Sequence, residues 1–168
     1  MTSFRTDIET AVPALRRYAR ALVRDRYAAD DLVQDTLERA WNKLHLWRPG
    51  SDMRAWLFTI MHNVFVNQVR SRRYEADVRV EDLPQVAVRA TQGQNLELAD
   101  VDRALRVLPA EQREVVLLVT VEDLTYEEVS RALDIPIGTV MSRLSRGRER
   151  LRQLMGGTHG GVALKAVK

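Results

Sequence analysis

The sequence predicts an all-α protein in which two small helical domains are joined by a flexible linker. Apolar residues recur at three- and four-residue spacing in two separate stretches of the chain. Between them lies a stretch without a helical period, and no segment shows the alternation of apolar and polar residues that is typical of a strand. The length of 168 residues allows one ordinary domain or two very small ones.

The composition limits the functions that the chain can perform. No apolar run reaches the length of about 18 residues that a membrane span needs, and the N-terminus lacks the apolar core of a signal peptide. We therefore expect a cytoplasmic protein with no membrane contact of its own. Cysteine is absent and the three histidines lie far apart, so we expect no metal site, no cofactor and no cysteine nucleophile.

The net charge of +3 conceals a strong segregation of charge along the chain. Residues 1–74 carry a balance of +5, and residues 136–155 carry +4. Residues 75–99 carry −3, and residues 100–135 carry −5. Two basic surfaces beside acidic segments favour a polyanionic partner, and nucleic acid is the first candidate.

The first half of the chain predicts a helical domain over residues 1–74. Apolar periods over 8–23, 32–44 and 56–69 indicate three amphipathic helices that can bury a small common core. The second and third helices are separated at residues 48–51, Arg-Pro-Gly-Ser, because proline and glycine do not readily continue a helix.

The second half predicts another domain after a linker. Residues 75–99 contain proline, glycine and several Gln, Asp and Glu residues without a sustained period, so they predict the linker. Helical periodicity resumes over residues 100–155, beginning with short helices at 101–108 and 115–119. The tail over residues 156–168 is expected to be disordered.

The end of the second domain has the pattern of a helix-turn-helix motif. Thr125 and Glu128 predict a capping box that opens a short helix over residues 126–133. A tight turn leads to a longer basic helix over residues 136–154, in which Pro136 suits the first position. In this motif the second helix enters the major groove of DNA.

The exposed face of this second helix carries side chains that suit DNA. Arginine can pair bidentately with guanine, and Ser or Thr can bond bases or phosphates. The pattern alone leaves another interpretation open, in which the two helices form an ordinary hairpin with a solvated basic face. The candidate DNA-reading residues are Thr139, Ser142, Arg143, Arg146 and Arg150.

Four segments carry a family resemblance. They are residues 28–36, AADDLVQDT; 54–63, RAWLFTIMHN; 108–115, LPAEQREV; and 124–148, LTYEEVSRALDIPIGTVMSRLSRGR. The first resembles the polymerase-binding helix of bacterial sigma factors and the second their promoter-melting segment. The last two resemble the second DNA-binding domain of those factors. The type that the chain resembles most is the extracytoplasmic-function (ECF, group 4) sigma factor, and two motif blocks in the right order make the resemblance specific.

The resemblance covers roughly residues 8–74 and 100–155. It implies that the protein binds RNA polymerase core through the clamp helices of the largest subunit and through the β flap. Asp31, Gln34 and Asp35 fall on the core-binding helix and share one helix face at positions i, i+3 and i+4. Two carboxylates and an amide suit arginine-rich partner helices. From the residues alone, the acidic side chains could equally serve only to open a helix, where the helix dipole favours them.

The segment over residues 47–73 is similar to the family's reader of the −10 promoter element, which captures an unstacked base. Asn63 stands where the family has an amide for such a base, and the loop over 48–54 would rim the pocket. Trp56 could stack on a base, although its place in the apolar stripe favours a core position. The terminal arginines can track phosphates or simply suit a helix end. The resemblance assigns −10 DNA to Arg54, Trp56, Asn63, Arg70, Arg72 and Arg73.

The resemblance assigns the −35 element to the candidate residues of the helix over 136–154. Met141 departs from the family, whose members commonly carry a basic residue there, so two roles stay open, packing on a thymine methyl or none. His62 has no partner within the sequence pattern and is not expected to bind a metal or to catalyse. An anti-sigma factor is expected as a partner from the family alone.

The sequence as a whole predicts a sigma factor, not an enzyme, that directs polymerase core to two-part promoters. A stand-alone helix-turn-helix regulator is the first alternative, but the first half has no ligand pocket, phosphoacceptor or coiled-coil seam. A helical adaptor that binds polymerase without DNA is the second, although it would not need Asn63 or the arginines at 143 and 146. An enzyme is least expected, because the pattern contains no nucleophile–base pair, glycine-rich phosphate loop or metal cluster.

Overall fold

The computed structural model of the protein describes residues 2–78 and 96–156. Seven α-helices and one short 3₁₀ helix occur in these two ranges, and neither range holds a strand. The predicted all-α fold class is therefore confirmed. None of the described helices is long and apolar enough to cross a membrane.

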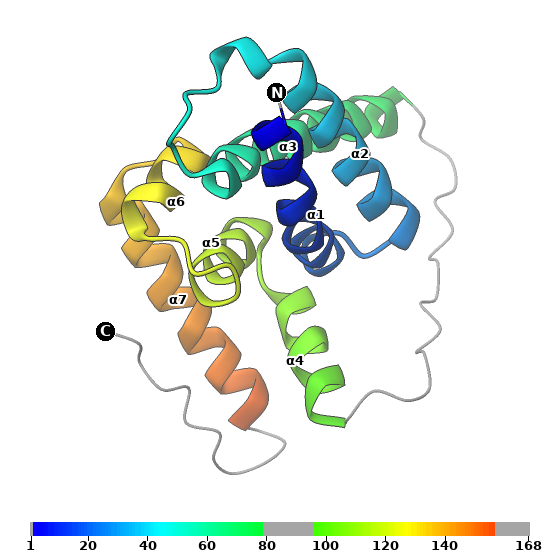
Figure 1. The fold of residues 1–168 in the computed structure, drawn as a ribbon. Coiled ribbons are helices and arrows are strands. Elements are labelled where there is room, and N and C mark those ends of the chain that lie inside the picture. The colour runs from blue at the N-terminus through cyan, green and yellow to red at the C-terminus, as the bar shows by residue number, and fades with distance from the viewer. Residues whose placement is uncertain (1, 79–95, 157–168) are drawn as a thin grey trace.

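The helices form two groups that follow the chain order (Figure 1). The first group consists of α1 (Thr2–Leu22), α2 (Arg26–Asn42), the 3₁₀ helix η1 (Leu44–Leu46) and α3 (Met53–Val78). The second group consists of α4 (Leu96–Val107), α5 (Ala110–Thr120), α6 (Tyr126–Leu133) and α7 (Ile137–Gly156).

Two helices extend into the predicted linker. α3 continues through residues 75–78, and α4 already begins with residues 96–99, so these parts of the predicted linker are helical. Each of these segments is only four residues long, too short to show a helical period of its own. The rest of the predicted linker, 79–95, and the predicted disordered tail from 157 onward lie outside the described residues.

The core of the first group is built from the predicted apolar positions. Leu15, Leu32 and Leu57 are fully buried. The rings of Tyr18 and Phe58 meet edge to face with their centroids 5.1 Å apart, a geometry that aromatic pairs prefer. This three-helix core fixes the relative placement of α1, α2 and α3.

Close packing between α5 and α7 defines the second group. Val140, Leu144 and Leu151 of α7 are buried, and Gly147 lies between them in the sequence. A Cβ atom on Gly147 would stand 2.6 Å from Cγ2 of Val116. The two helices can approach this closely only because residue 147 has no side chain.

The predicted helix-turn-helix motif is present. The backbone N–H of Glu128 donates to the Thr125 hydroxyl oxygen at 3.2 Å, and the N–H of Thr125 donates to the Glu128 carboxylate at 2.8 Å, which confirms the capping box. Asp134 ends α6 in the left-handed conformation with φ at 52°. Pro136 stands immediately before α7, so the predicted first position of this helix belongs to Ile137.

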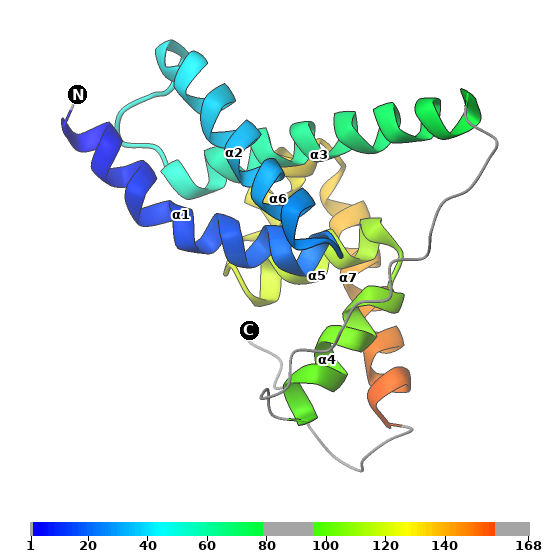
Figure 2. The same cartoon turned by 90° about the vertical axis from the view of Figure 1, so that its right-hand side faces the viewer.

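The two groups pack against each other. α3 contacts α6, and α1 contacts both α4 and α5. In Figure 2 the last turns of α3 project beyond the rest of the molecule. This arrangement decides which faces of the two domains are exposed and which are buried between them.

Candidate nucleic-acid interface

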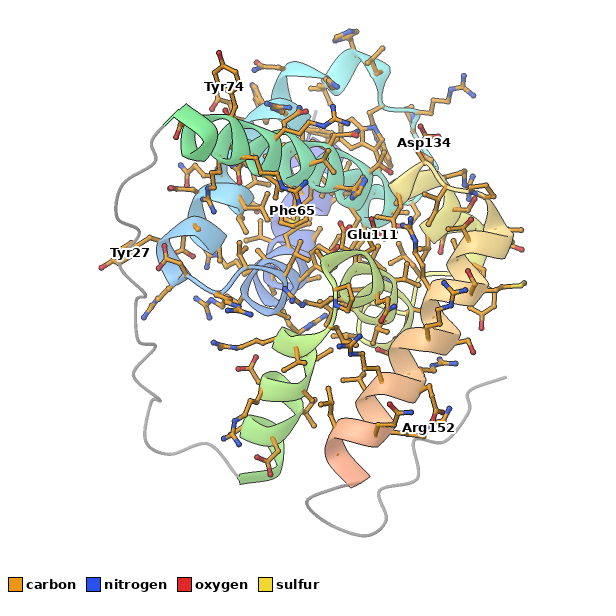
Figure 3. All side chains as sticks on the ribbon, turned by 180° about the vertical axis from the view of Figure 1, so that it is seen from behind. Tyr27, Phe65, Tyr74, Glu111, Asp134 and Arg152 are labelled. Atoms are coloured by element: carbon orange, nitrogen blue, oxygen red, sulfur yellow. The ribbon has the colours of Figure 1, made fainter. Side chains whose placement is uncertain are left out.

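The face of α2 that the sequence assigns to polymerase is largely exposed. Asp31 and Gln34 are exposed, whereas Asp35 is half-buried and accepts a hydrogen bond from Nε2 of Gln68 on α3 at 2.9 Å. Asp35 therefore also ties α2 to α3. Tyr27, one turn before Asp31, is 79% exposed and points away from the bundle (Figure 3). The sequence pattern does not single out this tyrosine, because a tyrosine in the first turn of a helix gives no signal of its exposure.

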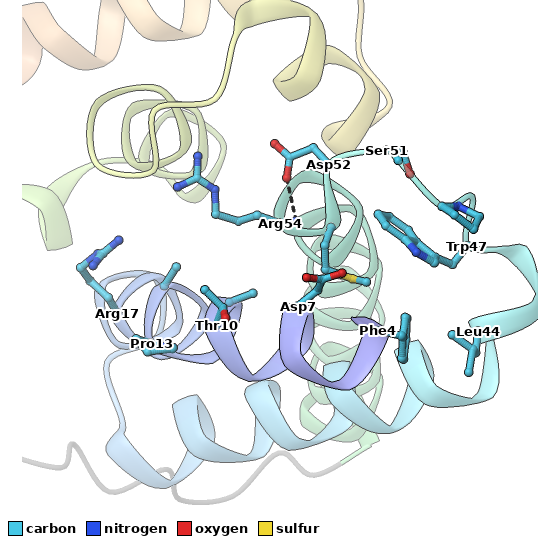
Figure 4. A pocket seen from close by; sticks show the side chains of 15 residues that line it. Phe4, Asp7, Thr10, Pro13, Arg17, Leu44, Trp47, Ser51, Asp52 and Arg54 are labelled. Carbon is cyan, nitrogen blue, oxygen red and sulfur yellow. Dashed lines mark hydrogen bonds between the residues drawn. The ribbon is translucent and has the colours of Figure 1, made fainter. Parts of the chain in front are cut away.

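An open cavity of about 1020 Å³ lies between α1 and the loop that precedes α3. Phe4 and Trp47 line one end of it, and Arg17 and Arg54 line the other (Figure 4). The loop that the sequence analysis expects as a rim lines the cavity as well. Two carboxylates, Asp7 and Asp52, line the cavity as well (Figure 4). The cavity therefore offers an aromatic end and two guanidinium groups, which suit the base and the phosphate of a nucleotide, beside two acidic side chains.

Trp56 supports the wall of this cavity without lining it. Its half-buried ring lies 5.3 Å from the ring of Trp47 and 6.4 Å from that of Phe4, centroid to centroid. This position agrees with the core placement that its apolar stripe favours. Asn63 is exposed on α3 but does not line the cavity. The structure therefore does not bring Asn63 and the loop rim together in one pocket.

The basic end of α3 is accessible. Arg70, Arg72 and Arg73 are exposed on the turns that project beyond the bundle (Figure 2). Tyr74 follows them and is 75% exposed (Figure 3). Arginines beside an exposed aromatic ring suit a single strand of nucleic acid, because the ring can stack on a base while the arginines pair with phosphates.

The candidate DNA-reading residues share one flank of α7. Since each residue of an α-helix is rotated by about 100° from the one before it, these five positions fall within an arc of about 100° around the helix axis. Ser142, Arg146 and Arg150 are exposed and Thr139 is half-buried. Arg143 is half-buried too, with its guanidinium 3.7 Å from the carboxylate of Glu111 on α5. Arg143 therefore faces α5 in part, and Arg146 is the more accessible arginine of the pair.

Gln112 of α5, which no sequence motif singles out, joins this flank. Gln112 lines an open cavity of about 680 Å³ together with Arg146 and Arg150. Its Oε1 atom is buried and has no hydrogen-bond partner in the structure. Only the packing of α5 on α7 brings Gln112 to this place, so no sequence spacing indicates it.

Two carboxylates of the second group are buried against the first group. Glu122 is fully buried and accepts hydrogen bonds from Nε and Nη2 of Arg17 at 3.0 and 2.8 Å. An oxygen of Glu114 lies 2.7 Å from Nδ1 of His62 and accepts from the Tyr18 hydroxyl at 3.5 Å. The hydrogen bond to Glu122 raises the pKa of Arg17, and burial raises the pKa of Tyr18 well above its ordinary value.

Arg113 is a buried cation at the same boundary. Its guanidinium donates to the carbonyl oxygens of Leu105, Arg106 and Leu108 near the end of α4, and to that of Leu22 at the end of α1. Burial lowers the pKa of this guanidinium. A cation is favoured at the C-terminal ends of helices, so Arg113 holds the two groups together.

These features define a class of protein. A helix-turn-helix domain with a basic recognition helix is packed on the first helical domain. That domain has a basic helix end and a cavity lined by two arginines and two carboxylates. In the described ranges, no group of three or more His, Asp or Glu side chains could hold a metal ion. The class is that of a two-domain helical DNA-binding protein.

The comparisons with known proteins identify the family. Residues 8–62 match the family described as the Sigma2 domain of PhyR, and residues 98–151 match Sigma-70, region 4. The chain is 39% identical over 158 residues to the ECF RNA polymerase sigma factor EcfG of Rhodopseudomonas palustris (strain TIE-1), covering 91% of this chain and 85% of EcfG. It is 32% identical to the ECF RNA polymerase sigma factor SigM of Mycobacterium tuberculosis (strain ATCC 25618 / H37Rv), covering 90% and 76% of the two chains.

A solved structure supports the same conclusion. The sigma factor RpoE from Bartonella quintana, in its co-crystal structure with the anti-sigma factor NepR, superposes with a TM-score of 0.83 at 37% identity, covering 95% of this chain and 100% of that chain. The present chain belongs to the ECF RNA polymerase sigma factors. It is thus a transcription initiation factor that directs RNA polymerase to promoters, as the sequence predicts.

Proposed function

We propose that three faces of the molecule divide the work of promoter-directed initiation. The exposed face of α2 with Asp31 and Gln34 binds polymerase core. The cavity on α1 and the basic end of α3 open and read the −10 element. The basic flank of α7 reads the −35 element as duplex DNA. The protein performs no catalysis of its own and works in the cytoplasm, where the polymerase transcribes.

The observation that carries this proposal is the flank of α7. Its polar side chains lie within one arc of about 100° on a flank of the recognition helix, beside the buried face of that helix. A bidentate arginine–guanine pair contributes about 1–3 kcal/mol of discrimination between bases. Arg146 and Arg150 can contribute such contacts, whereas Arg143 shares its charge with Glu111. Met141, 49% exposed, lies on the other flank of α7.

The cavity on α1 suits one nucleotide of the melted −10 strand. The base would stack against the half-buried ring of Trp47, which the buried Phe4 backs within the cavity wall, and the adjoining phosphate would pair with Arg54. Extracting a base from the stack costs a few kcal/mol, and stacking on an aromatic side chain restores about 1–3 kcal/mol per base. The two terms are of similar size, so capture stays reversible. Asn63, outside the cavity, would hold a different part of the strand.

Control by an anti-sigma factor is part of the proposal. RpoE was solved with the anti-sigma factor NepR, and CnrH was solved with the cytosolic domain of CnrY. CnrH superposes on this chain with a TM-score of 0.69 at 28% identity, covering 94% of this chain. The likeness of both proteins to nearly the whole chain supports a partner of the same kind here.

Run-off transcription with purified core polymerase tests the proposal. The template is a library of promoter DNA, transcribed with and without the protein. We expect selected transcripts whose templates share −10 and −35 elements. Duplex binding by the protein alone without such transcripts would instead support a stand-alone regulator. Core binding with neither activity would support an adaptor.

A further inference from the structure

Arg17 takes part in two sites at once. It lines the cavity on α1, as do Arg54 and the carboxylates of Asp7 and Asp52 (Figure 4). Its guanidinium also forms two hydrogen bonds with Glu122, at 3.0 and 2.8 Å. The first site belongs to the first domain, and Glu122 belongs to the loop between α5 and α6 in the second. One side chain therefore joins the cavity to the boundary between the domains.

The two partners of this ion pair differ in exposure. The Glu122 side chain is fully buried, whereas the Arg17 side chain remains 54% exposed. A buried carboxylate needs a cation or hydrogen-bond donors, because burial without them is costly. If the domains separate, water can hydrate Glu122, and Arg17 then keeps its charge beside the cavity without its partner. A guanidinium with its fork of donors is well suited to pair with a phosphate.

We propose that Arg17 alternates between two anions. It binds Glu122 while the domains are packed together, and it binds a phosphate of the melted −10 strand when they separate. This inference rests on the proposed function of the cavity as a nucleotide site. Because one guanidinium fork cannot serve both anions fully, strand binding and domain packing oppose each other. By linkage, a strand in the cavity favours separated domains to the same extent that separation favours the strand.

Two measurements on the full chain test the inference. The chain contains no cysteine, so cysteines introduced by Asn42→Cys in the first domain and Arg152→Cys in the second can be labelled selectively. Fluorescence energy transfer between the two labels measures the separation of the domains. Anisotropy of a labelled single-stranded DNA of mixed sequence, about 12 nucleotides long, measures strand binding. Both are run for the parent, Glu122→Gln, Arg17→Ala, Arg17→Lys and the double variant Arg17→Ala/Glu122→Gln. Arg20→Ala is the control, since Arg20 is an exposed arginine of the same helix that does not line the cavity.

The expected pattern separates the two roles of Arg17. Glu122→Gln should lower energy transfer and tighten strand binding, because it loosens the ion pair and leaves Arg17 in place. Arg17→Ala should also lower energy transfer, yet bind the strand about tenfold more weakly than Glu122→Gln, as expected for one charged hydrogen bond. In Arg17→Ala, the slope of log K for strand binding against log salt concentration should be shallower by about 0.7, the value for one phosphate contact on a single strand. The double variant should match Arg17→Ala, and Arg20→Ala should match the parent.

Other outcomes overturn the inference. If Arg17→Ala binds the strand as tightly as Glu122→Gln, Arg17 serves only to pair with Glu122 at the domain boundary and does not bind the strand. If neither variant changes energy transfer, the pair does not hold the domains together. Should Glu122→Gln melt early by circular dichroism, Arg17→Lys replaces it, because lysine keeps the charge but loses the fork and should resemble Glu122→Gln. Promoter-selective transcription by the parent protein is measured separately, so failure of the proposed function is distinguished from failure of this inference.

Discussion

At the scale of single residues, the boundary between the domains depends on polar side chains that are buried there. Tyr18 is a clear case, because burial raises its pKa well above the ordinary value. The unfolded chain releases the tyrosine proton near pH 10, whereas the folded protein retains it. The contribution of Tyr18 to the free energy of unfolding is therefore fully present below about pH 10. Above that pH it falls by up to about 1.4 kcal/mol per pH unit.

Tyr18→Phe should therefore remove part of the loss of stability at alkaline pH. The measurement is the free energy of unfolding in urea, followed between about pH 8 and pH 11. Tyr74→Phe serves as the control, since Tyr74 is 75% exposed and should leave the alkaline slope unchanged. Equal slopes for the parent and Tyr18→Phe would show that the buried hydroxyl is not linked to folding.

Arg146 is an exposed arginine on the flank of α7 that we propose reads the −35 element. Arg146→Ala should weaken transcription from −35-dependent promoters about tenfold, since a bidentate base contact contributes about 1–3 kcal/mol. Arg152→Ala is a matched control, because Arg152 is an exposed arginine of α7 that lies on the other flank and pairs with Glu149. Co-purification with core polymerase should be unchanged in both variants. Equal transcription by the two variants would remove Arg146 from the −35 site.

At the scale of elements, the close approach of α5 and α7 is set by Gly147. Gly147→Ala should destabilise the protein by about 1–3 kcal/mol, because the new methyl group stands too close to the buried, β-branched Val116. Gly138→Ala is the matched control in the same helix, since a Cβ there has no neighbour within 4 Å. It should stabilise α7 by up to about 1 kcal/mol through helix propensity alone. Thermal unfolding by circular dichroism measures both, and a stabilising Gly147→Ala would show that α5 and α7 can move apart freely.

The helices themselves were largely predictable from local sequence. The capping box of Thr125 and Glu128 has the same geometry in the structure as the sequence predicts, because its donors and acceptors lie within one turn. The ends of α3 and α4 were not predicted, since the segments 75–78 and 96–99 are too short to show a helical period of their own. Asp134, in the left-handed conformation, marks the turn that separates α6 from α7.

At the scale of the whole molecule, Arg113 couples the two domains by donating to the carbonyl oxygen of Leu22 in the first domain and to three carbonyl oxygens of its own domain. Arg113→Met should destabilise both domains, because the carbonyl oxygens of Leu22 and Leu108 lose this donor. The carbonyl oxygens of Leu105 and Arg106 keep the Leu108 N–H and Nη2 of Arg24 as donors. All three tryptophans lie in the first domain, so their fluorescence reports on that domain, whereas circular dichroism reports on all helices. We expect coincident urea transitions in the parent and a lower midpoint by both probes in the variant. An unchanged fluorescence midpoint would show that the first domain is stable without this contact.

The sequence by itself determined the helical class, the two domains and the family. These depend on apolar periods, caps and contiguous motifs, which are properties of neighbouring residues. Only the tertiary structure decided that Asp35 bonds Gln68, that Arg143 partly faces Glu111, and that Asn63 lies outside the cavity. It also revealed Arg17 beside Glu122, a pair that is 105 residues apart in the chain. Contacts across such separations arise from the packing of whole helices, and no local pattern encodes them.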